Sequence, residues 1–130
     1  MTNEKTFGLN AVRQVSVTAK VLDRAVMFYR EKLGIEHAFT VANMAFFDCG
    51  AMRIMLAVPE RPELDHPSSV LYFSVDDIHD AYRILRRRGV EFEGQPKIVA
   101  AMDHHDLWMA FFRDSEGNLL SLMAEQPREL

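Results

Sequence analysis

The alternation of apolar and polar positions predicts the first half of the chain as one strand, one helix and three strands. Residues 12–18 alternate between valine and polar side chains, which is typical of a strand with one buried face. Residues 21–33 carry apolar side chains at helical spacing, and Gly34 ends the predicted helix. The stripe consists of Leu22, Ala25, Val26, Tyr29 and Leu33. Three further strands are predicted, at residues 35–41, 44–49 and 52–58.

The second half repeats this order. Residues 70–75 predict a strand, and Asp76-Asp77 follows as the cap of a helix that ends at Gly89. The apolar stripe of that helix is Ile78, Ala81, Tyr82 and Leu85. Three strands are again predicted, at residues 97–102, 108–112 and 119–123. Each half is therefore expected to be a β-α-β-β-β module.

An internal repeat supports this division. MAFFDCG at residues 44–50 is nearly repeated as MAFFRDS at residues 109–115. Residues 59–68 contain three prolines and cannot continue a strand ladder, so they are expected to link the modules. The predicted organisation is a single domain with module one at about residues 10–58 and module two at about residues 69–124.

Composition narrows the class of protein. The 130 residues suffice for one domain with a real core, and a net charge of −4 argues against a nucleic-acid or membrane partner. Cys49 is the single cysteine, which favours a reducing compartment. No apolar run is long enough to cross a bilayer, and the first residues lack the pattern of a signal peptide. We therefore expect a cytoplasmic protein.

Three segments together resemble the vicinal oxygen chelate superfamily of glyoxalases, bleomycin-resistance proteins and extradiol dioxygenases. They read DRAVMFYREKLGI, LYFSVDDIHDAYRILRRRGV and FFRDSEGNLLSLM, and the similarity covers about residues 12–124. The resemblance implies an α+β fold in which two βαβββ modules form an incomplete barrel around a cavity, often within a homodimer. One such scaffold supports several activities, so the fold does not specify the function.

The resemblance also implies where metal ligands would lie. Metal-dependent members carry one ligand on the first and last strand of each module, and the matching positions here are Gln14, Met55, Val70 and Ser121. A divalent ion needs several histidine, carboxylate or comparable donors, and only Gln14 is a plausible one. The usual metal centre is therefore expected to be absent, and no cofactor is predicted.

The strongest alternative candidate for a metal site or a catalytic group is the run His104, His105 and Asp106. Neighbouring residues on an extended segment point in opposite directions, so a metal site would need a turn, or help from Gln14 or His66. The competing interpretation is a solvated loop. A single histidine, with His105 as the catalytic candidate, could also act as a general base, because its ordinary pKa suits neutral pH.

Strand alternation predicts which side chains line the cavity. The expected ligand-binding residues are Gln14, Ser16, Arg53, Met55, Tyr72, Ser121 and Met123, with Trp108, Met109 and Phe111 nearby. This lining is aromatic and rich in methionine, which suits a flat or apolar organic ligand. Arg53 could hold a carboxylate or stack on an aromatic ring, or it could lie at an open edge and extend to water.

Two functions remain open. The first, which we favour, is metal-independent binding of a small aromatic or planar molecule, because the lining is apolar and the metal ligands are missing. The alternative is a metal-dependent lyase, isomerase or dioxygenase with a divalent metal held by Gln14 and His104 or His105. In both cases the expected partners are a small organic molecule and a second copy of the chain.

Overall fold

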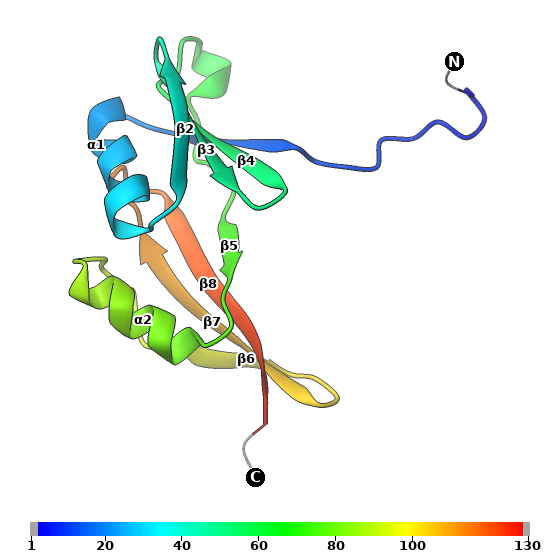
Figure 1. Cartoon of the computed structure of the whole chain (residues 1–130), viewed down its shortest axis with the longest axis vertical. Helices are drawn as coiled ribbons and strands as arrows, with labels where there is room; N and C mark the ends of the chain where they lie inside the picture. Colours follow the sequence, from blue (N-terminus) through cyan, green and yellow to red (C-terminus); the bar gives the residue numbers. More distant parts are fainter. Residues whose placement is uncertain (1–2, 129–130) are drawn as a thin grey trace.

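The chain folds as two βαβββ modules that do not close into a barrel, as the sequence predicts (Figure 1). The computed structural model describes residues 3–128. The first module consists of β1 (Gln14–Thr18), α1 (Leu22–Met27), a π-helical turn (Phe28–Lys32), β2 (Glu36–Val41), β3 (Met44–Cys49) and β4 (Met52–Ala57). The second consists of β5 (Leu71–Ser74), α2 (Ile78–Arg87), β6 (Lys97–Ala101), β7 (His105–Arg113) and β8 (Leu119–Pro127). The segment between them contains a short 3₁₀ helix (Pro62–Leu64).

Each module forms one four-stranded mixed sheet with the same topology. The strand orders are β1-β4-β3-β2 and β5-β8-β7-β6. The first and last strands of each module pair in parallel, and the remaining neighbours are antiparallel. Figure 1 shows α1 and α2 on the same side of the molecule. The opposite face of each sheet therefore carries neither α1 nor α2, and we call it the open face.

One core joins the two modules, and the internal repeat lies at its centre. Ala45 and Phe47 on β3 are fully buried, as are Ala110 and Phe112 at the repeated positions on β7. Because successive side chains of a strand point to opposite faces, the phenylalanines that precede Phe47 and Phe112 point to the open faces. Each MAFF segment thus contributes one aromatic ring to the core and one to the open face.

Several boundaries differ from the sequence prediction. The long predicted helix is a short α-helix continued by the π-helical turn, and β1 begins at Gln14 rather than at residue 12. β7 and β8 are longer than predicted, since pairing of His105 with Pro127 extends their ladder. His105 is therefore the first residue of β7 and not part of a loop. The N-terminal segment extends away from the body, with Leu9 exposed (Figure 1).

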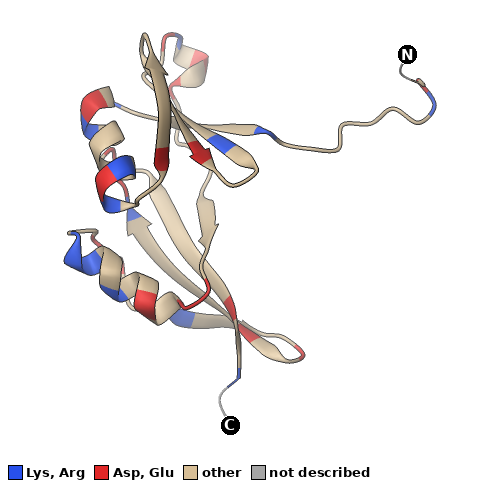
Figure 2. Cartoon of the chain, in the orientation of Figure 1, with Lys and Arg blue, Asp and Glu red and all other residues tan. Residues whose placement is uncertain are grey.

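Charged side chains lie mainly on the helices and connecting segments (Figure 2). Lysine and arginine gather at the C-terminal end of α2, where Arg88 donates a hydrogen bond to the backbone carbonyl of Lys32. Cations are favoured at this end because the helix dipole is negative there. Within residues 3–128, no helix has the length and apolar character needed to cross a membrane.

Candidate functional site

The open face of the first sheet brings together four of the predicted ligand-binding residues. Gln14 lies opposite Arg53 and Ser16 opposite Met55 in the parallel β1–β4 ladder. The alternate residues of β1 and β4, such as Val17 and Ile54, are buried beneath the helices. The register and the burial of the alternate residues therefore put these four side chains on the open face.

Arg53 has a fixed position on this face. Its Nε–H donates a 2.8 Å hydrogen bond to Oε1 of Gln14, and its guanidinium carbon lies 5.1 Å from the centroid of the Phe46 ring. The Gln14 amide nitrogen in turn donates to the Met55 sulfur at 3.7 Å. Because β4 is an internal strand between β1 and β3, Arg53 does not lie at the edge of the sheet.

A cavity of about 230 Å³ adjoins these residues. Its floor includes Ser16 and Met55, and the segment that links the modules covers one side. That segment contributes Leu64, His66 and Ser68; the sequence suggests His66 only as a helper of a metal site, and Leu64 and Ser68 not at all. Ser68 is anchored because its hydroxyl accepts a hydrogen bond from the backbone N–H of Thr18 at 2.9 Å. The prolines indicated an exposed linker but gave no sign that it folds back over the sheet.

The open face of the second sheet holds the aromatic part of the predicted site. In the ladder, Tyr72 and Phe111 flank Ser121, and their rings meet edge to face at 6.1 Å between centroids. Met123 lies on the same face, one alternate position along β8. Beside Phe111 is a second cavity of about 230 Å³, whose lining includes Lys97, Val99 and Met109.

Ser121 is fully buried between its aromatic neighbours. Its hydroxyl donates to the backbone carbonyl of Leu122 at 2.8 Å and lies 3.3 Å from that of Ala110. The Ser121 hydroxyl proton is therefore already committed to the strand backbone. Val70, the other predicted ligand position of this module, lies one residue before β5 begins.

Trp108 is not on the open face, which corrects the expectation that it lies near the ligand. Its ring meets that of His79 on α2 edge to face at 4.7 Å, and it packs against the core. The alternation of β7 explains the difference. Phe111 and Trp108 are three residues apart, so they point to opposite faces of the same strand.

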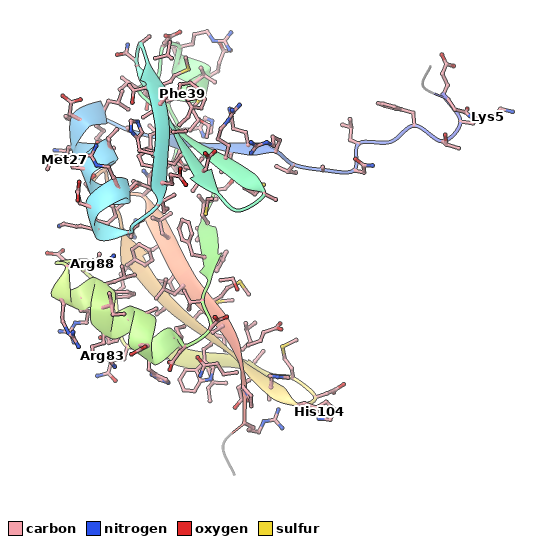
Figure 3. All side chains as sticks on the ribbon, viewed as in Figure 1. Lys5, Met27, Phe39, Arg83, Arg88 and His104 are labelled. Atoms are coloured by element: carbon pink, nitrogen blue, oxygen red, sulfur yellow. The ribbon has the colours of Figure 1, made fainter. Side chains whose placement is uncertain are left out.

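The histidine pair is remote from the first sheet. His104 lies at the outer tip of the β6–β7 hairpin (Figure 3), whereas Gln14 begins β1 in the other module. The alternative ligand set of Gln14, His104 and His105 is therefore not assembled within one chain. In the described part of the chain, no three histidine, cysteine, aspartate or glutamate side chains form a group that could hold a metal ion.

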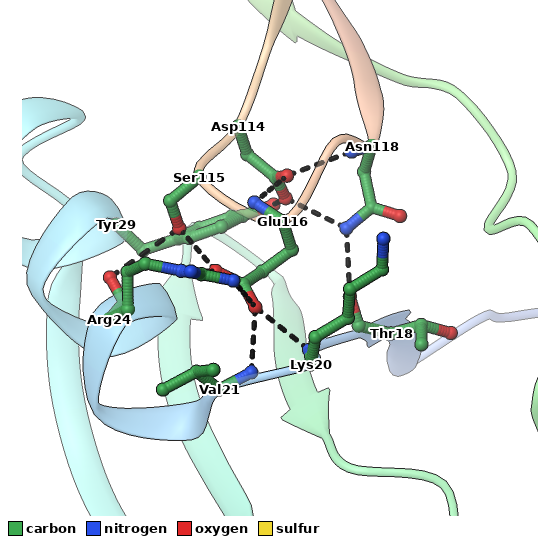
Figure 4. Close-up of polar contacts among 9 residues, drawn as sticks. All are labelled: Thr18, Lys20, Val21, Arg24, Tyr29, Asp114, Ser115, Glu116 and Asn118. Carbon is green, nitrogen blue, oxygen red and sulfur yellow. Dashed lines mark hydrogen bonds and ion pairs between the residues drawn. The ribbon is translucent and has the colours of Figure 1, made fainter.

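A buried polar network on the helix side joins the modules (Figure 4). We call it the latch. It connects the β7–β8 turn to the first module through Asp114, Ser115, Glu116 and Asn118 on one side and Thr18, Lys20, Val21, Arg24 and Tyr29 on the other.

The carboxylates of the latch carry most of its contacts. Asp114 accepts a 2.7 Å hydrogen bond from the Tyr29 hydroxyl, and burial together with the Asp114 charge raises the pKa of Tyr29 well above its usual value. Glu116 accepts from the backbone N–H groups of Lys20 and Val21, each at 2.8 Å, and from Arg24 Nε at 2.7 Å. Burial alone would raise the pKa of Glu116, but these hydrogen bonds, with one from Ser115, lower it to about 2. The latch thus holds an ionised carboxylate at the start of α1.

Comparison with known proteins agrees with this architecture. The family model described as the Glyoxalase/Bleomycin resistance protein/Dioxygenase superfamily matches residues 11–122. The chain belongs to this superfamily. No curated protein sequence matches the chain.

Solved structures of superfamily proteins share the fold at low sequence identity. The lactoylglutathione lyase of Agrobacterium tumefaciens has a TM-score of 0.72 at 19% identity, covering 90% of this chain and 95% of that one. A superfamily member from Sphaerobacter thermophilus gives 0.74 at 22% identity, with 90% and 98% covered. A third, from Alicyclobacillus acidocaldarius, gives 0.71 at 21% identity, with 89% and 92% covered. At these identities the likeness establishes the fold alone.

The residues at the superfamily's metal positions do not fit a divalent ion. Gln14 already accepts a hydrogen bond from a guanidinium, whose positive charge would repel a second cation. The neutral Ser121 hydroxyl is a weak ligand, Met55 offers a soft thioether, and Val70 has no donor atom. The superfamily fold is therefore retained with side chains that are unsuited to its usual ion.

Proposed function

We propose that this protein binds a small planar or aromatic organic molecule on its open faces, without a metal ion. The observation that carries the proposal is the apolar and aromatic lining of these faces, together with the lack of strong metal donors at Gln14, Met55, Val70 and Ser121. On the first sheet Phe39 stacks on Phe46 with 4.6 Å between ring centroids, and Met55 adjoins the cavity. On the second sheet Tyr72 is 45% exposed beside Phe111. Exposed rings and thioethers favour a flat ligand, because apolar area leaves water when it binds.

We also propose that a second copy of the chain completes the binding site. Neither of the two cavities described above is lined by both modules: the first is lined by module one and the linker, the second by module two. Large apolar side chains remain exposed on the outer strands of both sheets, namely Phe39 and Val41 on β2 and Ile98 and Val99 on β6. Apolar surface of this kind favours association. The unpaired Cys49 is consistent with a cytoplasmic location, because a reducing compartment keeps a thiol free.

The first experiment measures metal content and ligand binding on the same preparation. The native protein is purified without chelator or affinity tag and analysed by elemental mass spectrometry. It is then screened by thermal shift against planar aromatic compounds. We expect substoichiometric metal and an increased melting temperature with some of the compounds, since a ligand at a hundred times its Kd stabilises by about 2.7 kcal/mol.

The opposite result is equally clear. A stoichiometric transition metal that is lost in His104→Ala or His105→Ala would contradict the proposal and direct the search to lyase, isomerase and dioxygenase substrates. Oligomeric state is measured in parallel by sedimentation velocity. A monomer that binds ligand with full stoichiometry would contradict the completion of the site by a second copy.

A further inference from the structure

Arg53 is held in a single orientation by two contacts, and its terminal nitrogens remain available. Its Nε–H is bound to Gln14 Oε1, and its guanidinium plane lies over the Phe46 ring. No hydrogen bond to either terminal nitrogen is formed by residues 3–128. An arginine fixed in this way loses little conformational freedom when it binds a ligand.

The position of this charge is informative. Gln14 occupies one of the superfamily's metal positions, and Arg53 lies directly beside it in the ladder. Asp48 faces Arg53 across the β3–β4 ladder, but the two side chains form no ion pair within 4.0 Å in the described structure. The first open face therefore presents a fixed positive charge next to the residue that would otherwise bind a metal ion.

We propose that Arg53 selects ligands that carry a carboxylate, with Gln14 as its positioning residue. This inference rests on the proposed function and names the ligand class for the same site. The guanidinium fork matches a carboxylate through two parallel hydrogen bonds, which are stronger than bonds between neutral groups. The Arg53 guanidinium thus supplies the positive charge that an anionic ligand needs, and no metal ion is required.

The geometry of the face limits the shape of such a ligand. Met55 lies two residues beyond Arg53 on the same side of β4, and Ala57 lies four residues beyond. At 3.3–3.4 Å per residue, these positions are about 7 Å and about 13 Å from Arg53. The carboxylate would therefore sit at Arg53 while the flat apolar body lies over Met55 and reaches the cavity, whose lining includes Ala57. An aromatic ring on a short carboxylate chain has these dimensions.

The test compares matched acids and amides. The full-length protein is titrated by isothermal calorimetry with naphthylacetate, naphthylpropanoate and naphthylbutanoate, and with the primary amide of each. Wild-type protein is expected to bind at least one acid about tenfold or more tightly than its amide, as hydrogen bonds to a charged group allow. Arg53→Gln should reduce that preference to about twofold or less, and Arg53→Lys should retain part of it.

Gln14→Glu tests the positioning role. The substitution keeps an acceptor for Arg53 Nε but adds an internal negative charge that competes with the ligand. We expect the preference for acids to disappear while the amides bind as before. The Nε–H resonance of Arg53 in nitrogen-edited NMR spectra should shift with the acids and not with the amides. Arg30→Gln is the matched control, since it removes an exposed arginine of the π-helical turn, which lies on the helix side and not on an open face.

The outcomes separate this inference from the proposed function. Equal binding of acids and amides by the wild type, or loss of the preference in Arg30→Gln but not in Arg53→Gln, would overturn the carboxylate assignment and leave small-molecule binding intact. Failure of every acid and amide to bind would overturn both.

Discussion

Replacement of Glu116 by glutamine should remove the strongest charged contact between the modules. The Glu116 side chain is 1% exposed and accepts hydrogen bonds from the backbone N–H groups of Lys20 and Val21 and from Arg24 Nε. It thus fixes the chain just before α1 from the other module, and Val21 at the N-cap position forms no side-chain cap of its own. Glutamine keeps the shape but loses the charge and one acceptor oxygen.

The magnitude follows from the pKa of this carboxyl. The folded protein lowers the Glu116 pKa from 4.5 to about 2. At about 1.4 kcal/mol per unit, the ionised form contributes about 3 kcal/mol to the free energy of unfolding. Because the pKa is lower in the folded state, the unfolded chain binds more protons between these values. The contribution is therefore complete above pH 4.5 and is lost as the pH falls towards 2.

The assay is urea unfolding followed by the fluorescence of Trp108, the single tryptophan, between pH 2.5 and 7. Glu116→Gln should lower the free energy of unfolding by about 3 kcal/mol at pH 7, and the difference from wild type should shrink as the pH falls below 4.5. The matched control is Glu93→Gln, whose ion pair with Arg113 is about half exposed and should contribute less than about 1 kcal/mol. Equal losses in the two variants, or a difference that does not change with pH, would refute the reasoning.

Three further changes test the packing and the site. Asp77→Ala should lower the free energy of unfolding by about 1 kcal/mol in urea titrations, because the Asp77 side chain accepts hydrogen bonds from two backbone N–H groups of α2. Asp76→Ala, the control, should have little effect. Phe47→Ala should cost about 3–5 kcal/mol in the same assay, since this ring is fully buried; a loss below 1 kcal/mol would contradict its place in the core. Tyr72→Ala should weaken ligand binding in calorimetry with little change in melting temperature, and the reverse pattern would identify Tyr72 as structural.

The sequence predicts the modules well because local patterns determine them. Alternation along residues 14–18 correctly assigns Gln14 and Val17 to opposite faces, and Asp77 is the observed cap of α2. The MAFF repeat predicts two equivalent strands, and both copies bury the same two positions. These features depend on residues that are close together in the sequence, so a single sequence is enough to predict them.

The same periodicity could have placed Trp108 correctly. Phe112 repeats the buried Phe47, and Trp108 is an even number of residues from Phe112, so both point to the helix side. Two other features carried no local signal. The latch depends on how the β7–β8 turn meets α1, and the contribution of Leu64 to the cavity depends on a linker that folds back over β4. Both result from long-range packing, which no short window of sequence contains.

The latch and the open face lie on opposite sides of the sheets. Residues that contact a ligand can therefore be substituted without weakening the contacts that hold the two modules together. Glu116 joins the modules on the helix side, while Arg53 and Gln14 lie on the face without helices. Substitutions at the open face therefore need not disturb the contacts between the modules. If this is correct, Glu116→Gln should lower the free energy of unfolding and leave the acid-over-amide preference unchanged at temperatures where the variant is folded. Arg53→Gln should reduce the preference and leave the free energy of unfolding nearly unchanged. A shared effect of both substitutions on binding would mean that the site depends on the relative position of the two modules.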